Sequence, residues 1–131
     1  MSMIRHRYGI VIALLLLLCG NASAEIRLEG NELLLGSWLL KSVAPSLDKK
    51  RIPENRTWEF RSDGTIVVSG YNRHFHRNDT VTIKYHVEDG KMLAEQPGRP
   101  GKYMSYSVYE KSDKGMILKG GMEGFYFFDK N

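Results

Sequence analysis

The chain contains a single cysteine, Cys19, and only four prolines among its 131 residues. One cysteine excludes an internal disulfide framework and a zinc centre built on several thiolates, because each needs more than one sulfur. The low proline content and a charged fraction of 26% argue against a disordered chain. The length suits one domain with a single hydrophobic core.

The sequence also lacks the short motifs that mark common catalytic sites. It has no nucleophile elbow, no phosphate-binding loop and no metalloprotease helix. Serine, histidine and acidic residues are present, but no spacing links them into a catalytic triad. We therefore expect a protein that is not an enzyme and that needs no cofactor.

The first 24 residues have the three-part layout of a secretory signal peptide. Positions 5–7 are basic, positions 10–18 form an apolar run, and the small residues at 22–24 offer a cleavage site. The apolar run is well short of the roughly 20 residues that a membrane-spanning helix needs. We expect cleavage before Glu25 and export to the periplasm or the cell exterior.

Cys19 ends the apolar run, a place where some bacterial export signals receive a lipid anchor. Those signals carry a small residue directly before the cysteine, whereas this chain has Leu18. We therefore expect Cys19 to leave with the signal peptide. The remaining 107 residues carry 17 basic and 15 acidic side chains, a net charge of +2. This balance is spread along the chain and indicates no nucleic-acid surface, and no further stretch is apolar enough to span a membrane.

Apolar and polar residues alternate with a period of two through the rest of the chain, which predicts β-strands. The clearest strand covers 80–88, where every second residue is apolar. The Asp63-Gly64 and Asp89-Gly90 pairs predict tight turns. Residues 46–56 are expected to form a polar loop, and no helix of ten or more residues is indicated. The expected strands cover 35–43, 57–61, 65–71, 80–88, 91–95, 102–111, 115–119 and 124–129.

Short turns between about eight consecutive strands predict antiparallel neighbours. Eight such strands can close on themselves, which removes the exposed edges that invite aggregation. We expect an all-β fold, an antiparallel up-and-down eight-stranded β-barrel formed by residues 25–131. A two-sheet β-sandwich is the alternative. Neither an internal repeat nor a second domain is indicated.

Three short motifs follow one another along this region: Gly36-Ser37-Trp38, residues 58–65 and residues 85–93. Their order and spacing resemble lipocalins and small bacterial lipocalin-like domains. The resemblance implies that Gly36 and Trp38 plug the floor of the barrel. It implies a basic residue packed on the tryptophan, for which Lys119 and Lys130 are candidates. It also implies a non-catalytic binding protein.

Aromatic side chains are abundant and supply the candidate lining of the barrel interior. Such a lining would suit a small hydrophobic or amphipathic ligand. The alternative is that side chains fill a small eight-stranded barrel completely. The candidate ligand-binding residues are Trp58, Phe60, Tyr71, Tyr85, Tyr106 and Phe127.

The most unusual polar stretch is Arg73-His74-Phe75-His76-Arg77. A basic loop with Phe75 as an apolar anchor would suit docking to an acidic exported partner protein. In that alternative function the barrel is solid, and loops 70–79 and 96–102 contact the partner, as in an inhibitor or immunity-type factor.

The histidines of this loop also raise the possibility of a metal site. His74 and His76 would share one face if the strand continued, with His86 across the hairpin. No carboxylate or cysteine stands at a diagnostic spacing, however, so we expect surface histidines and no metal.

Two other basic stretches, residues 49–51 and 99–102, are most simply exposed loops. If they gather with Arg73 and Arg77 at one end of the barrel, their positive field would favour an anionic ligand.

Overall fold

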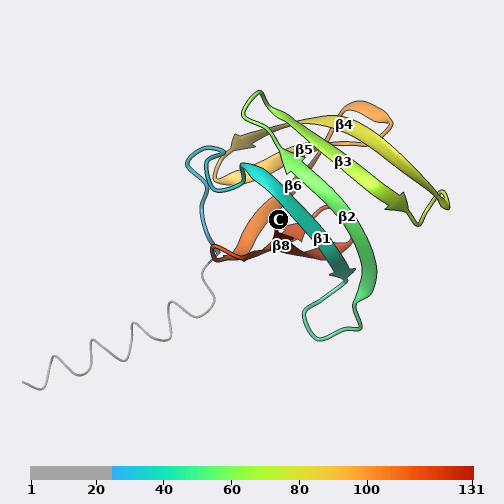
Figure 1. Ribbon diagram of the computed structural model, residues 1–131. Helices are drawn as coiled ribbons and strands as arrows, with labels where there is room; N and C mark the ends of the chain where they lie inside the picture. The colour runs from blue at the N-terminus through green and yellow to red at the C-terminus, as the bar shows by residue number, and fades with distance from the viewer. Residues whose placement is uncertain (1–24) are drawn as a thin grey trace, which may run out of the picture.

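The computed structural model describes residues 25–131, which form eight antiparallel strands closed into a barrel (Figure 1). The all-β up-and-down barrel is therefore confirmed, and hydrogen bonding between the first and last strands rules out the sandwich. The expected signal peptide and Cys19 lie outside the described residues. No helix within residues 25–131 is long and apolar enough to cross a membrane. The strands are β1 (Gly36–Ala44), β2 (Ile52–Phe60), β3 (Thr65–Asn72), β4 (Arg77–Glu88), β5 (Lys91–Gln96), β6 (Arg99–Lys111), β7 (Gly115–Gly120) and β8 (Gly124–Lys130).

The hairpin connections alternate between the two ends of the barrel. One end, here called the open end, carries the connections 45–51, 73–76, 97–98 and 121–123. The other, the closed end, carries the turns at 61–64, 89–90 and 112–114. Both turns predicted from Asx-Gly pairs are present at the closed end, each with its glycine at positive φ.

Residues 25–35 cross the closed end and form part of its floor. The Ile26 amide donates to the Val108 carbonyl at 2.9 Å, and the Leu28 amide donates to the Gly90 carbonyl at 3.0 Å. Leu28 and Leu34 are both buried beneath the strands. The barrel is therefore sealed at this end by chain that precedes its first strand.

Trp38 lies in the same floor and is 1% exposed. Its indole N–H donates to the Leu34 carbonyl at 2.9 Å, and the Lys130 ammonium lies 4.6 Å from its ring centroid. Gly36 leaves the room for this lysine, because a Cβ there would collide with the Lys130 ammonium. Of the two candidate lysines, Lys130 is thus the one on Trp38. Lys119 pairs with Glu25 instead, at 3.7 Å.

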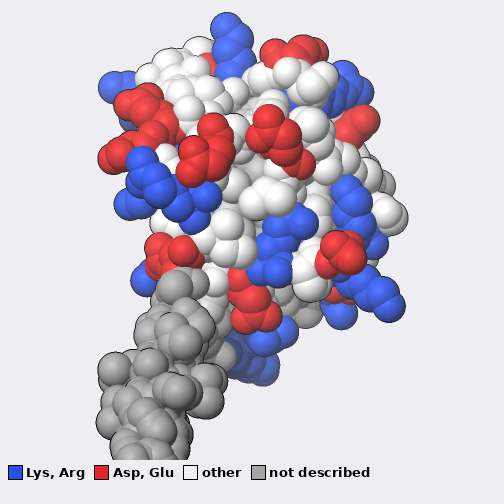
Figure 2. All heavy atoms as spheres, turned by 90° about the vertical axis from the view of Figure 1, so that its left-hand side faces the viewer, with Lys and Arg blue, Asp and Glu red and all other residues white. Residues whose placement is uncertain are grey.

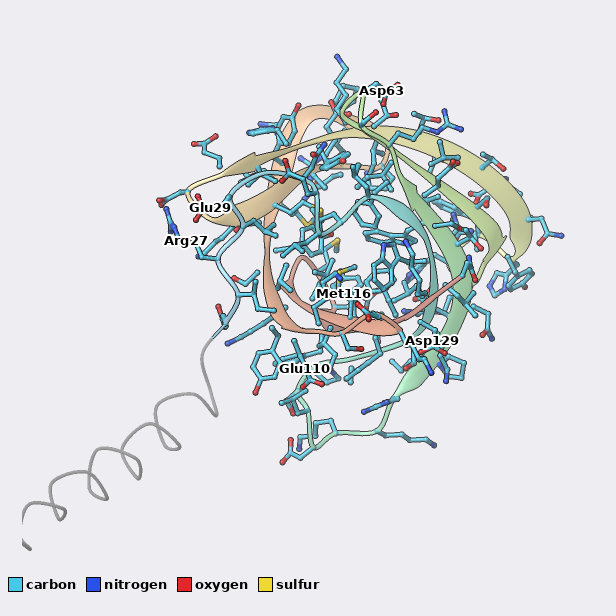
Figure 3. All side chains as sticks on the ribbon, turned by 60° about the vertical axis from the view of Figure 1, so that its left-hand side comes forward. Arg27, Glu29, Asp63, Glu110, Met116 and Asp129 are labelled. Carbon is cyan, nitrogen blue, oxygen red and sulfur yellow. The ribbon has the colours of Figure 1, made fainter. Side chains whose placement is uncertain are left out.

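The half of the barrel next to the closed end, called the lower half below, is filled with apolar side chains. Figure 3 shows Met116 inside the ring of strands, with Glu110 and Asp129 on its outside. Burial of these side chains is the main favourable term for folding. Across residues 25–131 as a whole, the largest fully buried side chains are Trp38, Phe60, Leu34, Ile66, Met92, Leu118, Val43 and Val108.

Residues 52–56 were expected to be loop, and the structure shows that they begin β2. The expectation is wrong because this half of the strand points Glu54 and Arg56 toward the barrel interior, so its inner face does not look apolar. The true connection is residues 45–51.

Candidate functional site

The half of the barrel next to the open end, called the upper half below, contains a cavity of about 410 Å³ that opens to solvent among the loops of that end. This volume lies within the range of roughly 300–1,000 Å³ that small-molecule sites occupy. The strands contribute mainly apolar walls. The apolar and aromatic strand residues at the cavity are Leu40, Trp58, Val68, Val81, Ile83, Met104, Tyr106 and Tyr126.

Trp58 forms the aromatic base of the cavity. Its ring centroid lies 5.2 Å from that of Phe128, 5.9 Å from Tyr126 and 6.4 Å from Tyr106. The Phe128 and Tyr106 contacts are edge-to-face, a geometry that aromatic quadrupoles favour. Of the predicted interior residues, Trp58 and Tyr106 therefore line the cavity.

Phe60 and Tyr85 point into the barrel, as expected, but they lie below the cavity. Their rings meet edge-to-face at 5.7 Å. The Tyr85 hydroxyl donates to the Arg61 carbonyl at 2.8 Å and accepts from the Asn31 amide at 3.2 Å. Burial raises the pKa of Tyr85. These contacts tie the floor segment to the barrel, so both residues stabilise the fold and do not line the cavity.

The interior positions expected for Tyr71 and Phe127 are wrong. Tyr71 lies on the outer face of β3 and is 47% exposed. Phe127 belongs to a small outer cluster with Ala44 and Phe125, while its neighbour Phe128 points inward. All four residues at 125–128 are buried aromatics, so alternation alone does not show which face each takes.

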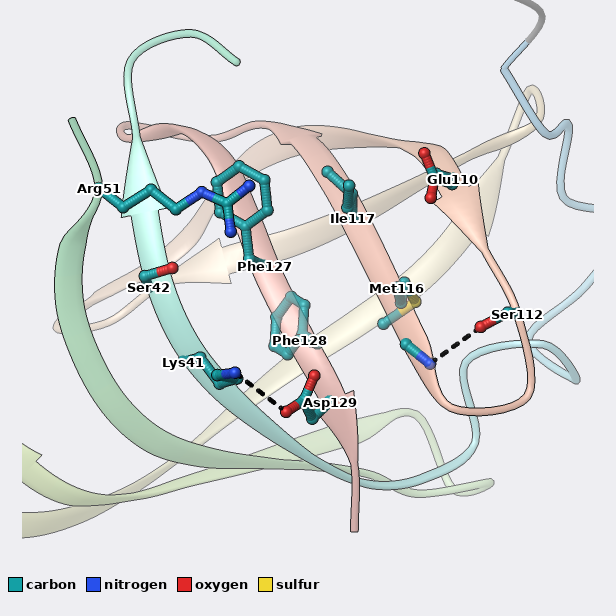
Figure 4. A pocket seen from close by; sticks show the side chains of 11 residues that line it. Lys41, Ser42, Arg51, Glu110, Ser112, Met116, Ile117, Phe127, Phe128 and Asp129 are labelled. Carbon is teal, nitrogen blue, oxygen red and sulfur yellow. Dashed lines mark hydrogen bonds and ion pairs between the residues drawn. The ribbon is translucent and has the colours of Figure 1, made fainter. Parts of the chain in front are cut away.

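Phe127 instead lines a shallow hollow of about 220 Å³ on the outer wall (Figure 4). The Arg51 guanidinium lies 3.8 Å from the centre of its ring. Lys41 and Asp129 pair across the same hollow at 3.4 Å. Arg51, one of the loop cations, is thus directed to the outer wall and away from the cavity.

A buried ion pair crosses three strands at the upper wall of the cavity. Arg56 on β2 is 7% exposed, and its guanidinium donates to the Gly70 carbonyl at 2.8 Å. The second guanidinium nitrogen lies 2.9 Å from Asp79 Oδ1 on β4. Gly70 stands between them in the cross-strand row. Because Gly70 has no side chain, Arg56 reaches across β3 to its partner.

Asn72 extends this polar row toward the mouth. Its amide donates to Asp79 Oδ2 at 3.0 Å. That hydrogen bond, followed by the Arg56 contacts, lowers the pKa of Asp79 below its ordinary value. The cavity therefore combines apolar walls with a row of hydrogen-bonded polar groups, an arrangement suited to an amphipathic ligand.

A second charged cluster lies at the rim. The Arg73 guanidinium bridges two carboxylates, with Nε 2.6 Å from Glu54 and Nη2 3.1 Å from Glu123. His74 Nε2 lies 3.7 Å from the same Glu123 oxygen. We call Glu54, Arg73, His74 and Glu123 the rim cluster; it joins β2 to two of the open-end connections.

The rim cluster also shows which potential metal ligands come together. Glu54, His74 and Glu123 each offer a donor atom, and these atoms lie within 4.8 Å of one another. The Arg73 guanidinium already bridges the two carboxylates, which satisfies them without an ion. The expected grouping of His74 with His86 does not form, because His86 stands near the closed end of β4, where its ring meets Tyr103 at 5.3 Å.

Tyr106 and Tyr126 frame the mouth beside the connection 121–123. Their rings meet at 5.3 Å, and the Tyr126 hydroxyl accepts from the Glu123 amide at 3.2 Å. Burial raises the pKa of both phenols, so both remain neutral hydrogen-bonding groups at ordinary pH.

The loop singled out from the sequence lies at this open end. Phe75 is 64% exposed, and the Arg77 guanidinium lies 5.6 Å from its ring centre. Residues 73–76 form a turn, so His74 and His76 do not share a strand face. His74, Phe75 and Arg77 line the cavity, and Arg73, which shares the rim cluster with His74, does not. On the face drawn in Figure 2, basic and acidic side chains are interspersed.

Sequence reasoning missed Glu54, Arg56, Asn72, Asp79 and Glu123. A signal for two of them was present: counting back by twos from Phe60 and Trp58 places Arg56 and Glu54 on the same inward face. Nothing local marks Glu123, which meets Arg73 only because two hairpins converge.

No protein-family model matches the chain, and no curated protein matches it. Among solved structures, the chain is similar to an uncharacterized protein from Bacteroides eggerthii DSM 20697, with 18% sequence identity and a TM-score of 0.55. The similarity covers 74% of this chain and 98% of that chain. At this identity the likeness shows a shared fold alone.

Proposed function

We propose that this chain is an exported, non-catalytic, lipocalin-like protein that binds a small hydrophobic or amphipathic molecule inside its barrel. The observation that carries the proposal is the cavity of about 410 Å³ above Trp58. A solid barrel, as the partner-binding alternative assumes, would have filled this space with side chains.

The chemistry of the walls supports an amphipathic ligand. Val68, Ile83 and Met104 supply apolar surface, which favours a ligand's hydrocarbon portion. Nearer the mouth, the polar row of Arg56, Asp79 and Asn72 is already internally paired. A ligand's polar group would therefore lie at the rim, where it stays close to water.

The likeness to lipocalins supports the same role. The resemblance implies a basic residue packed on the tryptophan, and the contact of Lys130 with the Trp38 ring supports this. Export follows from the signal-peptide layout of residues 1–24. Sequencing the N-terminus of the purified protein would test it, with Glu25 expected first and Met1 the contrary result.

Filling the cavity tests the binding proposal. Val81→Phe projects a larger side chain into the cavity, because Val81 lines it from β4. We expect the variant to bind the fluorescent apolar probe 1-anilinonaphthalene-8-sulfonate about tenfold more weakly than the unmodified protein, as measured by fluorescence titration. Mass spectrometry of the native protein should also show a co-purified small molecule that the variant lacks.

Val67→Phe is the matched control. Val67 pairs with Thr82 on the outer faces of β3 and β4, outside the cavity lining. This variant should bind the probe like the unmodified protein. Equal binding by all three proteins would contradict the proposal, and thermal melting would show that each is folded.

A further inference from the structure

The upper part of β4 has a free edge in an otherwise closed barrel. β4 pairs with β3 along residues 77–84, but it pairs with β5 only from Tyr85 to Glu88. The eight residues nearest the open end thus have a strand on one side only (Figure 1). A free strand edge is a template for pairing with another extended chain.

The register shows which backbone groups are free. The Lys84 amide points to the β5 side, where it donates to the Glu95 carboxylate at 2.9 Å, while the Tyr85 amide donates to Gly64 on the β3 side at 2.9 Å. Since successive residues of a strand alternate in direction, Asn78, Thr80 and Thr82 present their N–H and C=O groups to the open side. Within residues 25–131 no strand pairs with this side of Asn78, Thr80 or Thr82, so these six groups face no partner strand.

Glu95 shows where the ladder stops. Its carboxylate accepts from the Lys84 amide and, at 3.2 Å, from the Gly101 amide, which lowers the pKa of Glu95. The side chain stands where a β5 backbone carbonyl would continue the pairing. Beyond this point β4 and the β5–β6 hairpin separate.

The free edge borders the cavity. Val81 and Ile83 line it from β4, and Met104 and Pro97 line it from the β5–β6 hairpin. A strand laid beside Thr80 and Thr82 would therefore direct alternate side chains into an apolar space and the others to solvent.

Besides the Glu95 carboxylate, four exposed basic side chains surround the gap. Arg77 and Lys84 lie on β4, and Arg99 and Lys102 lie on the facing hairpin; all four are exposed. None of them has an ion-pair partner within the described residues. Acidic groups at the ends of an added strand would complement this basic rim.

We propose that the free edge of β4 binds an extended peptide segment by antiparallel strand addition. The segment places apolar side chains at every second position into the cavity and carries acidic residues at its ends. Backbone pairing goes beyond small-molecule binding and does not depend on it, because the edge is formed by Asn78, Thr80 and Thr82 alone.

A synthetic peptide tests this proposal. The probe has nine residues, with a glutamate at each end and four valines alternating with three threonines between them. The protein is expressed in full and purified in the form the cell leaves it. We expect saturable binding by fluorescence anisotropy, at least about tenfold tighter than that of the same peptide with lysine at both ends.

N-methylation of the peptide backbone reports the pairing directly. In an antiparallel pair, directly opposite residues share a face. The outward threonines would therefore direct their amides at β4, whereas the inward valines direct theirs away. Methylating the threonine amides should abolish binding, and methylating the valine amides should reduce it by less than about threefold.

Thr82→Pro tests the protein side of the pairing. Proline removes the Thr82 N–H, which faces the open side, and leaves the β3 ladder intact. We expect at least about tenfold weaker peptide binding, with probe fluorescence in the cavity unchanged. Thr82→Val is the matched control, because it keeps the N–H and the branched Cβ, and it should bind the peptide normally.

Three results would overturn the proposal: no saturable binding of the glutamate-ended peptide, equal loss from methylating either set of amides, or dimerisation without peptide binding. Dimerisation that Thr82→Pro abolishes would assign the edge to a second copy of this chain. If Thr82→Pro does not fold, the two methylated peptides still decide the question.

Discussion

Arg56 and Asp79 form a mostly buried ion pair at the barrel wall. Their side chains are 8% and 18% exposed, and their nearest nitrogen and oxygen lie 2.9 Å apart. Removing charges from water is costly, and their attraction and hydrogen bonds offset that cost only in good geometry. Gly70 and Asn72 supply the remaining hydrogen bonds. The pair therefore depends on four residues from three strands.

Lowering the pH should reduce the free energy of unfolding, because Asp79 becomes protonated. The Asn72 hydrogen bond, followed by Arg56, lowers the native pKa of Asp79 below 3.8. The unfolded chain then takes up the proton first. The contribution to stability is present above about pH 4 and is lost as the pH falls through the lower native pKa. Urea unfolding at pH 7, 4, 3 and 2 should show this loss, and Asp79→Asn should show a smaller one.

Asp129→Asn serves as the matched control for this titration. Its carboxylate is half-exposed, and its one ion-pair partner among residues 25–131 is Lys41, at 3.4 Å. This variant should keep the pH dependence of the unmodified protein. An Asp79→Asn variant with the same loss between pH 4 and 2 would contradict the assigned role of the pair.

At the scale of elements, β6 and β7 approach each other closely near the open end. Gly120 ends β7 with φ of 137°, and a Cβ there would collide with the Ser105 carbonyl of β6. That carbonyl also accepts from the Gly121 amide at 3.2 Å. The glycine is therefore required both for its backbone conformation and for the close approach of two strands.

Gly120→Ala should destabilise the protein more than an ordinary positive-φ substitution. Gly98→Ala is the comparison, because Gly98 has φ of 78° and no atom of the described residues lies within 4 Å of the position a Cβ would take. We expect a loss of about 1 kcal/mol for Gly98→Ala, from backbone strain alone. Gly120→Ala should lose at least about twice as much in urea denaturation. Equal losses would show that the approach to Ser105 is not tight.

The alternation of apolar and polar residues predicts some strands of this barrel better than others. Along β4 every second residue points inward as expected, because Ile83 and Tyr85 are apolar and their neighbours are polar. In β8 all four residues at 125–128 are aromatic, so the faces of Phe127 and Phe128 were not distinguishable. In β2 the inward-pointing residues Glu54 and Arg56 are charged, so the sequence did not predict a strand there. Their charges are neutralised by partners on other elements, which the local pattern does not show.

At the scale of the whole molecule, the barrel has one sealed and one open end. Residues 25–35, Trp38 and Lys130 close the floor, and the loops at the opposite end leave a cavity. This asymmetry lets the lower half supply stability while the upper half stays hollow. The stability of the fold should therefore depend most on floor residues.

Trp38→Ala should cost about 3–5 kcal/mol of unfolding free energy, because the indole is fully buried and its removal leaves a void. Met122→Ala is the control, since Met122 is 80% exposed on an open-end connection. Its effect should stay within about 0.5 kcal/mol. Urea denaturation measures both, and a loss below about 0.5 kcal/mol for Trp38→Ala would contradict its role in the floor.

The sequence by itself determined the number of strands, their antiparallel order and the two Asx-Gly turns, whereas the choice of a closed barrel over a sandwich came from the pairing of β1 with β8. The first three features follow from side-chain alternation and turn chemistry, which act between residues close along the chain. Only the tertiary structure decided which aromatics face inward, that Arg56 meets Asp79, that Arg73 bridges Glu54 and Glu123, and that β4 leaves part of its edge free. Those outcomes depend on strand register and on where separate hairpins converge, which no local pattern specifies.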